Sequence, residues 1–136
     1  MSATETRALI ARYYEAFNAG SIEGMLALLD EDVAHDRNQG ERKIGRETFK
    51  DFSIHMKRCY REHLTDLVIM VSEDGSHAAA EFTVNGTYLE TDEGLPPASG
   101  QTYVLPAGTF FQIEDDKIVR VTTCYNLNDW IAQVSR

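Results

Sequence analysis

The chain has 136 residues, of which 43% are hydrophobic and 26% charged, a balance that predicts one globular domain over residues 1–136. Its formal net charge of −9 repels phosphate backbones and anionic lipid, so neither nucleic acid nor a membrane surface is an expected partner. No apolar run approaches the roughly 20 residues of a membrane span and no signal-peptide core is recognisable, so a cytoplasmic location is expected.

The first part of the chain is predicted to be helical. Within residues 4–19, Leu9, Tyr13 and Phe17 recur every four positions and therefore share one face of a helix. An Ala-Gly pair ends this helix, and a shorter second helix is expected from residue 22 to about residue 29.

A short strand and a third helix are expected next. Residues 33–37, which read Val-Ala-His-Asp-Arg, have the character of a strand, and a polar loop follows them. From residue 46 to about residue 63 the spacing of a helix returns. It is carried by Phe49, Phe52, Met56, Tyr60 and His63.

The second half of the chain changes to the pattern of strands. Four long strands are expected, at residues 66–73, 77–90, 101–114 and 117–125. A hairpin turn is expected at residues 73–76, a bulge or bend near Pro106, and a terminal helix at residues 126–134. Helices followed by antiparallel strands make an α+β pattern, and a curved sheet covered by helices forms a cone whose open end is a pocket.

Residues 12–21, which read RYYEAFNAGS, resemble a motif of the NTF2-like superfamily, in particular of ketosteroid isomerase and its SnoaL-like relatives. The following residues up to Val33 are similar to the family's second helix and acidic turn, and residues 45–49 resemble the start of its third helix. The resemblance extends over essentially the whole chain. It implies an NTF2-like cone, in which a curved antiparallel sheet wraps around the N-terminal helices and encloses an internal pocket.

The resemblance also implies a chemistry, although a shared fold does not fix a function. In ketosteroid isomerase a carboxylate removes a proton next to a ketone, while a tyrosine and a protonated aspartic acid stabilise the oxyanion. Tyr13 matches the family's tyrosine. Independently, Tyr13 lies on the buried face of the first predicted helix, where its hydroxyl needs a hydrogen-bond partner.

The position of the base is ambiguous. Counting without a gap from the first motif puts it at Arg37, and counting back from Gly45 with one deletion puts it at Asp36. A slip of one residue moves a side chain to the other face of a strand, so either His35 and Arg37 or Asp36 face the pocket. A histidine beside an aspartate is competent for acid/base work near neutral pH. The alternative is a solvated strand end that carries surface charges.

The family's protonated aspartate has no counterpart here. Its position falls at Thr109, or at Gly108 if the turn differs, and residues 101–113 contain no carboxylate. Loss of one oxyanion donor typically costs about 10²–10³ in rate, so steroid isomerisation itself is not expected.

Other residues are candidates for substrate contact or for a metal. The candidate substrate contacts are Arg37, Met56, Tyr60, Thr109, Phe111, Val121, Thr123, Tyr125 and Trp130. Cys59 and His63 have the spacing of two metal ligands on a helix, but two ligands do not make a site, so no metal is expected and no other cofactor is implied. His55 is expected at the surface, and Cys59 and Cys124 are expected to be reduced thiols.

The sequence predicts a small cofactor-free enzyme, an isomerase, cyclase or dehydratase, that acts on a small hydrophobic carbonyl compound. Its candidate catalytic residues are Tyr13, His35 and Asp36. One alternative is a binding module that holds a small apolar ligand without catalysis. Another is an interaction domain that pairs through the outer face of its sheet. A homodimer is expected in every case.

Overall fold

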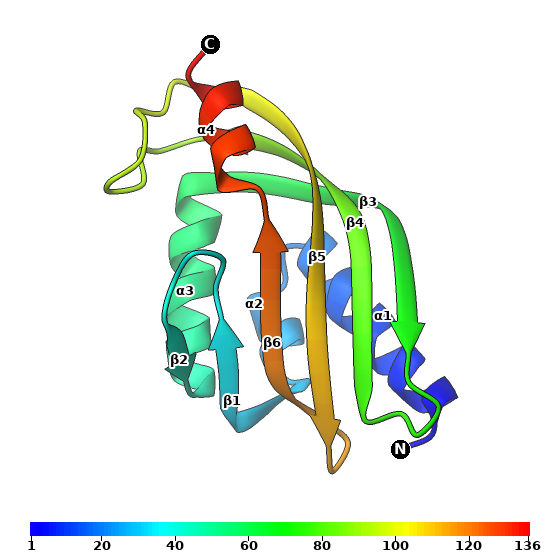
Figure 1. Cartoon of the computed structure of the whole chain (residues 1–136). Coiled ribbons are helices and arrows are strands. Elements are labelled where there is room, and N and C mark those ends of the chain that lie inside the picture. The colour runs from blue at the N-terminus through cyan, green and yellow to red at the C-terminus, as the bar shows by residue number, and fades with distance from the viewer.

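Four helices and six strands make up the computed structural model of the chain, which describes residues 1–136 (Figure 1). In chain order the elements are α1 (Ala3–Asn18), α2 (Ile22–Leu26), β1 (Leu29–Asp36), β2 (Arg42–Ile44), α3 (Arg46–Cys59), β3 (Tyr60–Val71), β4 (His77–Tyr88), β5 (Thr102–Glu114), β6 (Lys117–Tyr125) and α4 (Leu127–Val134). None of the helices combines the length and the hydropathy needed to cross a lipid bilayer.

The strands form one curved, open sheet in the order β2-β1-β6-β5-β4-β3. Four of the five pairings are antiparallel, and β1 pairs with β6 in parallel, so the sheet is mixed rather than wholly antiparallel. Figure 1 shows α1 and α2 behind the sheet, α3 beside β1 and β2, and α4 at the end of the sheet where β3 bends over α3. The expected α+β architecture with N-terminal helices inside a curved sheet is confirmed.

The core lies between α1 and the inner face of the sheet. Along β4 and β5, buried and exposed residues alternate, so one face of these strands packs on the helices and the other meets solvent. Helix α1 begins at a capping box formed by Ser2 and Glu5, and it buries Leu9, Ile10 and Tyr13 against the sheet. The sheet contributes Phe82, Phe111, Ile118 and Val121 to the same core.

The third helix is shorter than the sequence predicts, because β3 begins directly after Cys59. Tyr60 pairs with Tyr88 and Leu64 pairs with Val84, so this part of the backbone bonds to β4 instead of continuing the helix. A spacing of four residues, as between Met56 and Tyr60, also fits the two-residue repeat of a strand. The pattern therefore could not mark where the helix ends.

Two further expectations concern turns. The hairpin between β3 and β4 is confirmed, with Gly75 at a φ of 73°. No bulge interrupts the pairing of β4 with β5 around Pro106. Pro106 lies one residue beyond the last pairing of β5 with β6, at Ala107, where a missing N–H need not break a ladder. The register of β5 against β6 shifts instead between Gln112 and Ile113.

Candidate functional site

The end of β1 carries the ionisable residues whose orientation the sequence left open. Val33 and His35 are buried on the inner face of β1, and Asp36 points to the opposite face. Arg37 follows the strand and lines the same pocket as His35. The register is therefore the one counted without a gap. The pocket has a volume of about 270 Å³ and is lined by His35, Arg37, Lys43, Thr48, Asp51, Phe52 and His55.

His35 is held between aromatic side chains of α3. Its side chain is only 5% exposed, and its ring centroid lies 4.6 Å from that of Phe49 and 4.9 Å from that of Phe52. Burial, reinforced by the positive charge of Arg37, lowers the pKa of His35 to about 4. The imidazole is therefore neutral at pH 7, where it can donate or accept a hydrogen bond but is a weak base.

Two hydrogen-bond donors beside His35 have no partner within the chain. The Arg37 guanidinium lies over the Phe52 ring, 5.2 Å from its centroid, and its Nε is buried without a partner. The amide nitrogen Nδ2 of Asn38 is also buried and unpartnered. Buried donors normally find an acceptor, so this end of β1 is suited to an oxygen-bearing ligand.

Asp36 serves the sheet instead of the pocket. Its carboxylate accepts hydrogen bonds from Arg42 at 2.6 and 2.9 Å and from the Thr122 hydroxyl at 2.7 Å. The hydrogen bond from Arg42 is the main reason that the pKa of Asp36 falls to about 2. The structure thus does not bring Asp36 together with His35 or Tyr13, and its contacts tie β1 to β2 and β6.

A half-buried carboxyl group that was not predicted from the sequence lies on β3. Glu62, Gly86 and Tyr103 are opposite one another in neighbouring strands. Because Gly86 has no side chain, the Tyr103 ring lies across β4 and its hydroxyl donates to Glu62 Oε2 at 2.5 Å. Burial raises the pKa of Glu62, although the hydrogen bond from Tyr103 opposes the shift.

Tyr103, the hydrogen-bond partner of this carboxyl group, belongs to a cluster of aromatic side chains. Tyr60 stacks on Tyr88 at 5.3 Å and meets the edge of Trp130 at 5.9 Å, and Tyr103 lies 6.0 Å from Trp130. Burial raises the pKa of Tyr125, the negative charge of Glu62 raises it further, and the side chain of Asn38 lowers it. Tyr125 therefore lies near both Glu62 and the end of β1.

The first-helix tyrosines lie in the core. Tyr13 is 5% exposed, and its ring centroid is 5.2 Å from that of Tyr14 and 5.4 Å from that of Phe111. Burial raises the pKa of Tyr13 well above its usual value, so the hydroxyl stays protonated and can donate. The Tyr14 hydroxyl is buried without a hydrogen-bond partner.

The remaining predicted contacts lie along the inner face of the sheet and on α3. Thr109 and Val121 are buried, and Thr123 is half-buried opposite Thr109 in the pairing of β5 with β6. Met56 packs partly buried against the core. None of these residues lines the pocket at His35.

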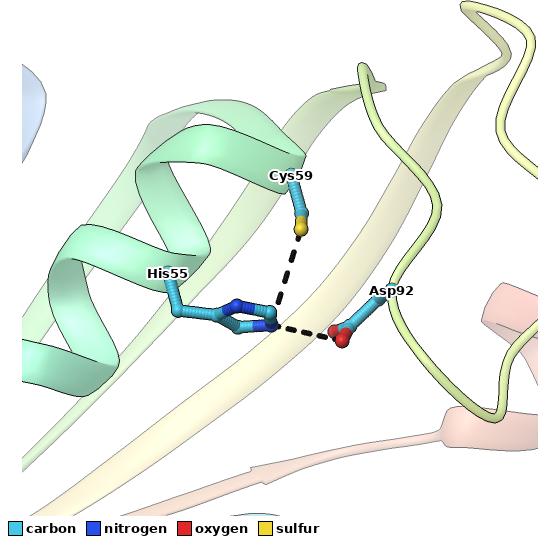
Figure 2. Close-up of side chains that lie close together, drawn as sticks. All are labelled: His55, Cys59 and Asp92. Atoms are coloured by element: carbon cyan, nitrogen blue, oxygen red, sulfur yellow. Dashed lines mark hydrogen bonds and ion pairs between the residues drawn. The ribbon is translucent and has the colours of Figure 1, made fainter.

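Figure 2 shows His55 and Cys59 on successive turns of α3, with Asp92, from the loop between β4 and β5, turned toward His55. His55 Nε2 lies 2.8 Å from Asp92 Oδ1 and 3.9 Å from Cys59 Sγ. His55 is thus half-buried and hydrogen-bonded to Asp92 rather than free at the surface. His63, on β3, is exposed, so it does not share a site with Cys59.

The same three side chains are the group most able to hold a metal, since their ligand atoms all lie within 4.8 Å of one another. However, Arg58 approaches His55 Nδ1 at 3.1 Å, and a guanidinium only donates, so the proton of the imidazole lies on Nε2. That proton occupies the position of a metal and is directed at Asp92. His55 Nε2 is also the ring nitrogen that lies near both Asp92 and Cys59. A proton relay from Asp92 through His55 to Cys59 would need both ring nitrogens, so this geometry rules it out.

The family model described as a SnoaL-like domain matches residues 10–121. A solved structure from Pseudomonas putida KT2440, provisionally described as a polyketide cyclase, is 62% identical, with a TM-score of 0.93 and 98% of each chain covered. Another from Silicibacter sp. TM1040, described in the same way, is 57% identical with a TM-score of 0.96, covering 100% of this chain and 99% of that chain.

A more distant structure bears on the fold alone. An NTF2-like protein of unknown function from Burkholderia pseudomallei K96243 is 18% identical, with a TM-score of 0.76 and 100% of each chain covered. No curated protein matches the chain. The NTF2-like fold expected from the sequence is confirmed.

Proposed function

The chain belongs to the SnoaL-like domain family, and we propose that it is a cofactor-free enzyme that moves a proton next to the carbonyl group of a small hydrophobic compound. Such a step needs a base of suitable pKa and hydrogen-bond donors for the oxygen on which negative charge develops. It is common to isomerases, cyclases and dehydratases. The observation that carries the proposal is the half-buried Glu62 carboxyl group, bonded to Tyr103.

Glu62 is the proposed base. Its raised pKa moves the carboxyl group toward the pH at which it can both accept and return a proton. Tyr103 bonds to Oε2, which leaves Oε1 for the substrate. In the first step Oε1 takes a proton from the carbon beside the carbonyl, and the electrons of the C–H bond move into the carbonyl to form an enolate. Return of the proton at another carbon completes an isomerisation.

The proposed donors for the enolate oxygen lie beside Tyr125. Asn38 Nδ2 has no partner of its own, and the Tyr125 hydroxyl lies near both Asn38 and Glu62. Burial keeps the hydroxyls of Tyr125 and Tyr13 protonated at neutral pH, because it raises the pKa of both. Tyr13 remains a candidate donor from deeper in the core, and His35 a candidate neutral hydrogen-bonding group.

Deuterium exchange tests the proton transfer without knowledge of the final product. We would incubate the protein in D₂O with a panel of enones and 1,3-diketones and follow loss of the α-proton signals by NMR. Glu62→Gln removes the base and is expected to lower the exchange rate by about 10²–10⁴. Glu81→Gln, the same change on an outward-facing, exposed residue of β4, is expected to leave it unchanged.

Equal exchange by wild type and Glu62→Gln would contradict the assignment of the base. Binding of panel compounds with no catalysed exchange would favour the alternative, a binding module without catalysis. Tyr13→Phe in the same assay measures whether Tyr13 acts as a donor: a role predicts a loss of about 10²–10³.

We also propose that the protein forms a homodimer through the outer face of the sheet. Phe110 is 52% exposed and Val104 is 58% exposed on the outer face of β5, and apolar side chains grouped on a surface favour association. A dimer is expected in sedimentation at micromolar concentration, and Phe110→Lys should weaken it. A single species of 15.3 kDa for wild type would contradict this expectation.

A further inference from the structure

Arg37 differs from every other basic residue of the chain. Four of the 13 lysines and arginines are partly buried. Of these, Arg46 donates to a backbone carbonyl, Lys50 pairs with Glu23, and Arg120 donates to a threonine hydroxyl. The fourth, Arg37, has neither an ion pair nor a hydrogen bond from its side chain, although 22 carboxylate residues are present.

A partly buried guanidinium without a partner costs free energy unless a bound ligand supplies the missing hydrogen bonds. A guanidinium that is partly removed from water loses hydration, and its buried Nε loses a hydrogen bond that solvent would supply. Contact with the Phe52 ring offsets only part of that loss. The protein has a net charge of −9 and therefore many carboxylates, yet none of them forms an ion pair with Arg37.

The next residue, Asn38, also has an unpartnered donor, but it belongs to the proposed proton-transfer site. Its Oδ1 accepts the backbone N–H of Tyr125 at 3.1 Å, which fixes the amide group and turns Nδ2 away from that bond. Nδ2 is buried and has no partner. Asn38 does not line the pocket beside Arg37, so its Nδ2 stays available for the enolate oxygen, and Arg37 is the unpartnered donor of the pocket itself.

The pocket beside Arg37 suits a small anionic group. Its volume of about 270 Å³ is below the range of drug-sized ligands. Its lining has two cationic side chains, Arg37 and Lys43, and one carboxylate, Asp51. Lys43 has a weak, exposed pairing with Glu41 at 3.9 Å, so Arg37 is the lining cation that remains uncompensated.

We propose that this pocket binds the carboxylate of the compound on which the enzyme acts, with Arg37 as its anchor. A planar guanidinium matches the two oxygens of a carboxylate, and Phe52 lines the same pocket, where its ring can contact the apolar part attached to the carboxylate. The substrate is then a small carbonyl compound with an acid group, rather than a neutral ketone. This inference rests on the proposed function, because it names the substrate class of that enzyme.

Binding of benzoate measures the recognition without turnover. We would titrate wild type with sodium benzoate, benzamide and inorganic phosphate by calorimetry and by ¹H–¹⁵N NMR. Benzoate is expected to bind at least tenfold more tightly than benzamide and phosphate, with shifts at His35, Arg37 and Phe52. Arg37→Met keeps an apolar stem over Phe52 but removes the charge, and it should weaken benzoate binding at least tenfold. Arg12→Met changes the net charge equally at an exposed site on α1 and should have no effect.

Each other outcome overturns the proposal. Equal affinity for benzoate and benzamide would mean that the charge is not recognised, and this comparison needs no variant. Phosphate binding without benzoate binding would make the pocket a site for an inorganic anion. An unchanged benzoate affinity in folded Arg37→Met would remove Arg37 as the anchor. Glu62→Gln should still bind benzoate, so a failure here is distinguishable from a failure of proton transfer by Glu62.

Discussion

Acidification should destabilise the protein through His35, a residue of the inner face that the fold keeps neutral. Its pKa is about 4 in the folded protein and 6.5 in an unfolded chain. The folded pKa is the lower one, so the unfolded chain binds more protons between these two values. The contribution of His35 to stability is therefore complete above about pH 6.5 and is lost as the pH falls toward about 4.

The expected magnitude follows from those two pKa values. At pH 7 protonation favours the unfolded chain by about 0.2 kcal/mol, and at pH 5 by about 2 kcal/mol. Wild type should thus lose about 2 kcal/mol of unfolding free energy between pH 7 and pH 5 through this residue. Glu62 acts in the opposite direction over this range, because its folded pKa is raised. Asp36 and Asp74, each with a pKa of about 2, lose their contributions only at lower pH.

Comparison of His35→Gln with wild type isolates the effect, since the other groups titrate in both proteins. Urea unfolding at pH 7, 6 and 5 can be followed by the fluorescence of Trp130, the single and buried tryptophan. His35→Gln should lose about 2 kcal/mol less than wild type on acidification, whatever its stability at pH 7. His63→Gln, at an exposed position, is the matched control and should behave as wild type. If wild type and His35→Gln lose stability equally between pH 7 and pH 5, the reasoning about His35 is wrong.

Two further predictions concern the sheet. Gly86→Ala should cost about 1–3 kcal/mol in urea unfolding, because the new methyl group would overlap the Tyr103 ring, whereas Gly40→Ala, whose methyl group would meet its nearest atom at 3.5 Å, should be nearly neutral. Equal costs for the two variants would contradict the packing described for Tyr103. Asp36→Asn should lower stability by less than about 1 kcal/mol, because solvent screens its half-exposed ion pair with Arg42, and should leave carbonyl exchange unchanged. A large loss of exchange by a stable Asp36→Asn would return Asp36 to the site.

The elements with one strong pattern could be predicted from the sequence. The stripe of Leu9 and Tyr13 predicts the buried face of α1, and the segment Lys117–Tyr125 is found as a strand with the expected bounds. Both depend on local periodicity, which the tertiary structure leaves unchanged. The short strand β2 was not predicted, because its three residues are all exposed and its pairing with β1 is its main support.

The register of β1 was beyond local reasoning. From the sequence, the inner face could hold either His35 and Arg37 or Asp36. Both registers fit equally well, because one deletion in the loop exchanges them. The structure decides the matter through distant residues: Arg42 on β2 and Thr122 on β6 hold the Asp36 carboxylate on the outer face. An ion pair to one distant strand and a hydrogen bond from another have no signature in the five residues around Asp36.

The carboxyl group sought on β5 illustrates a different limit. The resemblance places the family's protonated aspartate on this strand, but residues 101–113 have no acid. Several strands contribute side chains to the inner face of a sheet. An acid can therefore come from β3 while β5 supplies the tyrosine that bonds to it. The sequence contained the necessary sign: in the order Tyr60, Arg61, Glu62, alternation from a strand that begins at Tyr60 turns Glu62 inward. The error in the end of α3 concealed it, because on a helix Glu62 would lie about two turns beyond His55 with no strand partner. The misplaced end of α3 thus hid the inward orientation of Glu62, the proposed base. The exchange assay with Glu62→Gln tests whether that inward carboxyl group performs the proton transfer.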